Sequence, residues 1–154
     1  MIDLDITELF EEIVKELPEG LEILYPNGKG GTKVMKSPRL NYIFGSSQYI
    51  KDILDEYSKS SAQSERKLPV VALFTPISED RGDADYFSKA KVSLIIACSS
   101  CKEWSNEMRR TTSFKNILRP IYKRSLEVLY EDSRFDCDYD EKVKHSYSEN
   151  YSYG

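Results

Sequence analysis

The sequence predicts an α+β domain, in which about three helices pack on one face of a small, mainly antiparallel sheet. Residues 68–75 (LPVVALFT) and 91–97 (KVSLIIA) are apolar, rich in β-branched residues and bounded by turn residues, as strands are. No helical stripe separates them, so we expect an antiparallel pair rather than a βαβ crossover. Apolar residues at helical spacing before and after these runs supply the helices, which is typical of the α+β class.

Length and composition fit one domain. The chain has 154 residues, of which 40% are hydrophobic, and this suffices for a single core. We assign residues 1–132 to the α+β domain and residues 133–154 to a Tyr-rich polar tail or loop, ordered against a partner. The net charge of −4 argues against a generally cationic nucleic-acid surface.

The cysteine count and the apolar runs bear on the compartment. Three cysteines, without a basic N-terminal region, argue against a secreted disulfide framework and indicate reduced thiols inside a cell. No apolar run approaches the roughly 20 residues that cross a bilayer, so no membrane contact is expected.

The first helix is predicted from six apolar residues at the spacing of one helix face. Asp5 stands at the N-cap and Glu8 three residues later, as in a capping box. Pro18 and Gly20 are expected to end the helix. The stripe consists of Ile6, Leu9, Phe10, Ile13, Val14 and Leu17.

A short strand over residues 21–25 and a segment over 26–38 follow this helix. The segment holds three glycines and two prolines and is expected to be an extended loop or a long hairpin. Its glycines suggest phosphate binding, but the P-loop pattern is absent. Lys29 and Lys33 are instead candidates for contact with nucleic acid or an acidic protein surface. A second helix is expected from Ser46 or Ser47.

A third helix is predicted over residues 114–129. Its apolar face extends over about four turns at helical spacing. Pro120 falls inside this helix, so a kink or a new helix start is expected there.

Cys98 and Cys101 form a C-x-x-C motif at the end of the second strand. A thiol–disulfide oxidoreductase carries such a pair between a strand and a helix, where the helix N-terminus favours the thiolate. Here the motif comes late in the chain, and no βαβ unit is predicted before it. A zinc site would need Cys137 and His145 as further ligands, at a loose spacing. The simplest interpretation makes Cys98 a small apolar residue of the core.

Two groups of charged residues and the tyrosines are candidate interface residues, and no catalytic or cofactor motif accompanies them. An acidic loop and a basic helix could meet across subunits, because a ring interface joins different faces of one subunit. Tyrosines serve as anchors at such interfaces. The acidic group is Glu79, Asp80, Asp83 and Asp85, the basic group is Arg109, Arg110, Arg119 and Lys123, and the tyrosines are Tyr147, Tyr151 and Tyr153.

Several segments of the sequence resemble those of a known class of proteins. They are YIFGSSQYIKDIL, LPVVALFTPISEDRGDADYF, KVSLIIA and FKNILRPIYKRSLEVL, within residues 40–154. Their order resembles neck proteins of tailed bacteriophages, of the crAss-like or Bacteroides phage type, including head–tail connectors and tail terminators. Tail-terminator domains close their sheet with a strand after the last helix, which the polar residues after Asp132 do not clearly show.

This resemblance implies a structural virion protein and no enzyme. It implies a homo-oligomeric ring, six- or twelve-fold, between the portal and the tail, in contact with adjacent neck or tail proteins and with packaged DNA. The protein would be assembled in the host bacterial cytoplasm and reside in the virion. No cofactor, metal or catalytic residue follows from it. The alternative is a thiol–disulfide oxidoreductase that uses Cys98 and Cys101.

Overall fold

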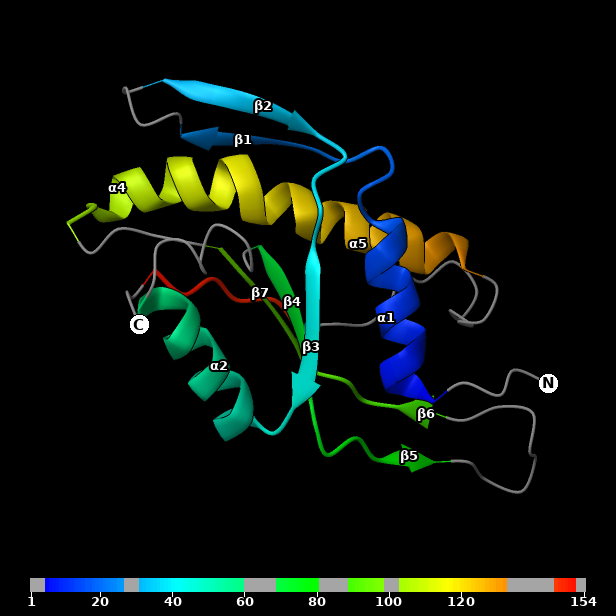
Figure 1. The fold of residues 1–154 in the computed structure, drawn as a ribbon. Helices are drawn as coiled ribbons and strands as arrows, with labels where there is room; N and C mark the ends of the chain where they lie inside the picture. Colours follow the sequence, from blue (N-terminus) through cyan, green and yellow to red (C-terminus); the bar gives the residue numbers. More distant parts are fainter. Residues whose placement is uncertain are drawn as a thin grey trace.

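The computed structural model describes residues 5–26, 31–59, 69–80, 89–98, 103–132 and 146–151. The helices are α1 (Ile6–Glu16), α2 (Ser47–Lys59) and a long helix of three consecutive parts, α4 (Asn106–Met108), η1 (Arg109–Leu118) and α5 (Arg119–Glu131). The strands are β1 (Glu22–Pro26), β2 (Thr32–Lys36), β3 (Asn41–Gly45), β4 (Val70–Phe74), β5 (Glu79–Asp80), β6 (Lys89–Ala90) and β7 (Leu94–Ala97). The predicted α+β class is confirmed, and the strand pairs are mainly antiparallel (Figure 1).

The central sheet has the strand order β3–β4–β7. Strands β4 and β7 pair antiparallel, as the sequence predicts, with Val71 opposite Ile96. Strand β3 was not predicted, and it runs parallel to β4 with Tyr42 opposite Val71. A parallel pair requires a crossover connection, and α2 lies in the connection between these two strands.

Strand β4 is buried on both of its faces. Val71 and Leu73 belong to the main core cluster, which they share with α1 and the long helix. Val70 and Ala72 point to the other face and are also buried. Helix α2 packs against β3 and β4 there and buries Ile50. The helices therefore cover both faces of the sheet, whereas the sequence predicted one, because the βαβ unit was not foreseen.

The main core lies between α1, the sheet and the long helix. The predicted stripe of α1 provides Phe10, Ile13, Val14 and Leu17, all buried. The predicted capping box is present, since the Asp5 carboxylate accepts a hydrogen bond of 2.9 Å from the Glu8 amide. Helix α1 ends at Glu16, and Gly20 takes a positive φ of 80° in the turn that follows, a conformation that glycine adopts readily.

Strands β1 and β2 form a separate antiparallel hairpin, which realises the hairpin alternative for residues 26–38. On β1, Ile23 is only 1% exposed, and the strand packs against η1. Strand β2 is exposed at all five positions, including Val34 and Met35. In Figure 1 this hairpin lies along the long helix, on the side away from the short β5–β6 hairpin.

The long helix changes its winding before Pro120. Residues Arg109–Leu118 form a π-helix, and the Arg119 amide donates to the Phe114 carbonyl five residues back. An α-helix then begins at Arg119 with the proline in its first turn. Proline has no amide hydrogen to donate and is tolerated at a helix start, so the predicted restart at this residue is what the structure shows.

Candidate functional site

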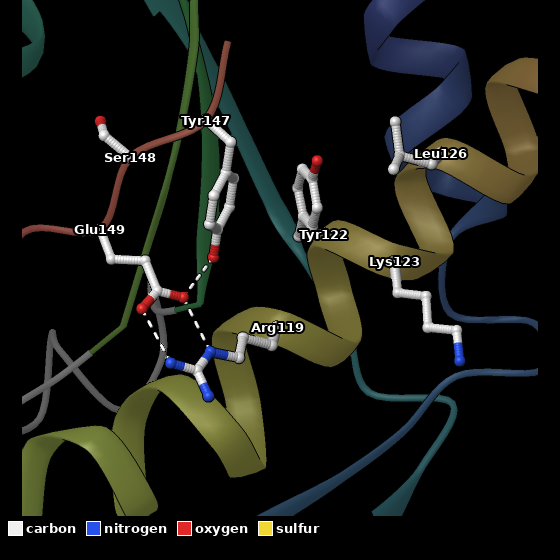
Figure 2. Close-up of a pocket in the computed structure, with 7 residues that line it drawn as sticks. All are labelled: Arg119, Tyr122, Lys123, Leu126, Tyr147, Ser148 and Glu149. Carbon is white, nitrogen blue, oxygen red and sulfur yellow. Dashed lines mark hydrogen bonds and ion pairs between the residues drawn. The ribbon is translucent and has the colours of Figure 1, made fainter. Parts of the chain in front are cut away.

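The C-terminal segment 146–151 lies against the long helix and meets it through an ion pair. The Arg119 guanidinium donates two hydrogen bonds to the Glu149 carboxylate, of 2.7 Å from Nε and 2.8 Å from Nη2 (Figure 2). Two tyrosines of the segment add to it: the Tyr147 hydroxyl donates to Oε2 of Glu149, and the Tyr151 hydroxyl donates to Oε1 at 3.0 Å. Paired bonds of this kind fix the orientation of both groups.

Two aromatic contacts flank this ion pair. The rings of Tyr122 and Tyr147 have centroids 4.4 Å apart, and so do the rings of Phe114 and Tyr151. Aromatic pairs at such distances are stabilising beyond the apolar area that they bury. Tyr147, early in the segment, contacts Tyr122, late in the helix, whereas Tyr151 contacts the earlier Phe114. The segment therefore runs antiparallel to the helix.

A third anchor holds the backbone of the segment. Nη1 of Arg109 donates a hydrogen bond of 2.9 Å to the carbonyl oxygen of Tyr151. The helix therefore binds the segment through a backbone carbonyl, two tyrosine rings and one carboxylate of the segment.

The spacing of the contact residues matches on the two elements. Tyr147, Glu149 and Tyr151 alternate in sequence, so an extended segment presents all three on one side. On the helix, Arg109 and Phe114 are five residues apart, as are Phe114 and Arg119. In an α-helix such residues would point about 140° apart, whereas the i→i+5 bonds of a π-helix bring them closer to one face. The widened winding of η1 thus helps to form the site.

The ion pair shifts the protonation equilibria around it. Hydrogen bonds from Arg119, and then from Tyr147, lower the pKa of Glu149 to about 2. The same pair raises the pKa of Arg119. Burial, followed by the Glu149 hydrogen bond, raises the pKa of Tyr147 to about 12. At neutral pH the ion pair therefore joins a carboxylate to a guanidinium, with the neutral phenol of Tyr147 beside them.

An open hollow of about 660 Å³ lies beside the ion pair, between α5 and the segment (Figure 2). Its lining combines aromatic rings with charged groups. It is formed by Arg119, Tyr122, Lys123, Leu126, Tyr147, Ser148 and Glu149.

The structure brings together five of the predicted interface residues and separates others from them. Arg109 and Arg119 both donate hydrogen bonds to Tyr151. Tyr147 donates to the carboxylate that Arg119 binds, and Lys123 lines the adjoining hollow. Arg110 is exposed on η1, and Lys33 is exposed on β2. Glu79 and Asp80 form β5, which Figure 1 places at the other end of the molecule from the long helix. Lys29, Asp83, Asp85 and Tyr153 lie outside the described residues.

Three contact residues were not foreseen as site residues: Phe114, Tyr122 and Glu149. The alternation of Tyr147, Glu149 and Tyr151 was a usable signal, since a strand with such a pattern presents one side to its support. Because the sequence predicted a tail that awaits a partner, the helix of the same chain was not considered as that support.

Cys98 lies half-buried at the end of β7, packed against the main core. Burial raises the pKa of its thiol to about 11. The thiol is therefore protonated near neutral pH, in contrast to the thiolate of a reactive cysteine. Cys101, Cys137 and His145 lie outside the described residues.

No protein-family model, curated protein or solved structure matches the chain. Within the described ranges, no three His, Cys, Asp or Glu side chains are grouped as metal ligands would be. The same part of the chain contains no helix with the length and hydropathy of a membrane span.

Proposed function

We propose that this chain is a structural subunit that assembles into a ring, and that this ring belongs to the neck of a tailed bacteriophage, between the portal and the tail. The resemblance of the sequence to neck proteins supplies the location. The structure supplies a surface suited to assembly, and the β1–β2 hairpin carries the argument.

Strand β2 offers a pairing edge that its own domain does not cover. All five of its residues are exposed, and Val34 and Met35 are 49% and 37% exposed on opposite sides of the strand. An exposed edge strand is a template for pairing with another chain. Lysines on an edge strand oppose its pairing with arbitrary chains, and β2 carries Lys33 and Lys36. Their positive charges favour a partner surface with acidic groups.

Two exposed acidic residues lie on elements at the other end of the molecule. Glu79 lies in the β5–β6 hairpin, and Figure 1 places this hairpin beside the N-terminal end of α1, where Glu8 is exposed. The basic groups Arg110 and Lys115 are exposed on η1, near the β1–β2 hairpin. Opposite charges at opposite ends suit a head-to-tail contact, and repeated head-to-tail contacts form a ring when the rotation between neighbouring subunits closes.

The test is the native mass of the purified protein, with electron microscopy of the particles. We expect rings for the wild type and smaller species for V34E/M35E, because charges then line the pairing edge. F44E is the matched control, since Phe44 is 48% exposed on β3, and its rings should persist. A wild type that stays monomeric at high concentration overturns the proposal, and so do rings that V34E/M35E leaves unchanged.

A further inference from the structure

We infer that the face of the long helix that holds residues 146–151 is a subunit-linking site, occupied in the assembled ring by the same segment of a neighbouring copy. This inference rests on the proposed function, because it requires copies that lie side by side. It specifies which segment crosses between them and which residues receive it.

Recognition at this site is local. Every contact described comes from three alternating residues, Tyr147, Glu149 and Tyr151, together with one backbone carbonyl. The helix contributes two guanidinium groups and two rings. A site of this kind binds a short extended peptide, and it makes the same contacts whether that peptide belongs to its own chain or to another.

The segment can leave its helix without opening the domain. Its residues do not belong to the core cluster, which joins α1, β1, β4 and the long helix. Tyr147 is 49% exposed even when docked. The contacts are those of a surface, and a surface contact can be exchanged between identical subunits at low cost.

The length of the connection permits such an exchange. Thirteen residues, 133–145, join the end of the long helix to the segment, and 13 residues span at most about 45 Å. Within one chain, the connection needs to return only from Glu131 to Tyr122, which is about 14 Å along the helix axis. A domain of this size has a radius of gyration of about 15 Å, so the helix of an adjoining subunit is within reach.

Neighbours in a ring are also held at a high effective concentration. A tethered segment beside a second identical site experiences millimolar concentrations of it, so weak contacts suffice for occupancy. Exchange around the ring would then link each subunit to the next without any new surface.

The experiment uses two charge-reversed variants, R119E and E149R. In R119E two carboxylates face each other, and in E149R two guanidinium groups do, so neither variant can form the ion pair by itself. In an equimolar mixture, opposite charges meet only between chains. We expect native mass spectrometry to show assemblies in which the two variants alternate at 1:1, well above their statistical share. The double variant R119E/E149R should assemble like the wild type.

A second measurement leaves the charges intact. A photoreactive phenylalanine analogue at position 147 should cross-link to the region of Tyr122 on another chain and yield a covalent dimer. K51E, which reverses an exposed charge on α2, should mix with E149R only at random.

The outcomes separate the two proposals. A wild-type ring, with random mixing of R119E and E149R and only intrachain cross-links, overturns the exchange and leaves the proposed function standing. A wild type that is monomeric throughout overturns both. Alternating mixtures with interchain cross-links support the exchange.

Discussion

Tyr42 donates its phenolic hydrogen to the carbonyl oxygen of Thr7, 2.9 Å away, and so joins strand β3 to the first turn of α1. Burial, followed by the nearby carboxylates of Glu11 and Asp5, raises the pKa of this hydroxyl. Tyr42 also packs against the main core. This hydrogen bond therefore joins β3, which was not predicted from the sequence, to α1, which was predicted with its stripe and its N-cap.

Removal of this hydroxyl should destabilise the fold measurably. We expect Y42F to lower the free energy of unfolding by about 1 kcal/mol, the usual contribution of a single hydrogen bond. Urea denaturation measures the change. Y49F serves as the control, because Tyr49 is 51% exposed and should have little effect. Equal stabilities of Y42F and the wild type would show that the bond is not formed in solution.

The buried side chain of Ile121 should be far more costly to truncate. It is 0% exposed and lies in the main core on α5. I121A removes buried methyl groups and leaves a cavity, so we expect a loss of about 2–5 kcal/mol in unfolding free energy. I95A changes the same residue type at a position that is 37% exposed and should cost less. Similar losses for both variants would contradict the position of the core.

The docking of the C-terminal segment should depend on acid. The pKa of Glu149 is lowered from an ordinary value of 4.5 to about 2, so its protonation opposes the ion pair with Arg119. The stabilisation is fully present above pH 4.5 and is lost as the pH falls from there toward 2. NMR signals of Tyr147 and Tyr151 should shift toward those of a free peptide in this window.

The E149Q variant provides the control for this titration. Its amide cannot titrate, so the tyrosine signals should remain constant over the same pH range. A wild-type titration that E149Q reproduces would assign the change to other groups.

The Cys98 thiol should react slowly. Burial raises its pKa to about 11, so the thiolate fraction at pH 8 is about 100-fold lower than for a thiol with the ordinary value of 9.0. In C101S/C137S, an aromatic disulfide reagent should label Cys98 at about this lower rate, and only labelling after denaturation should be fast. Rapid labelling of the native protein would support the oxidoreductase alternative.

The sequence predicted those elements whose residues carry a regular pattern. The apolar stripe and the capping box predicted α1, and runs of β-branched residues predicted β4 and β7. Strand β3 has five residues and ends at Gly45, one residue before α2 begins at Ser47. Its short pattern could not be distinguished from the expected loop and helix start.

The candidate site was harder to predict, because it forms only where the C-terminal segment folds back onto the long helix. Arg119 and Glu149 are 30 residues apart, and no local pattern indicates that they meet. The π-helical winding of η1 also departs from the period of 3.6 on which a helical face is judged. The charged and aromatic residues were recognised as interface candidates, but their mutual contacts were not.

Strand β4 has a further consequence for motion in the native state. It is hydrogen-bonded to a strand on each side and covered on both faces, and four of its five residues are buried. Solvent reaches its amides only when the whole domain opens, so deuterium should enter β4 last, at a rate that reports global unfolding.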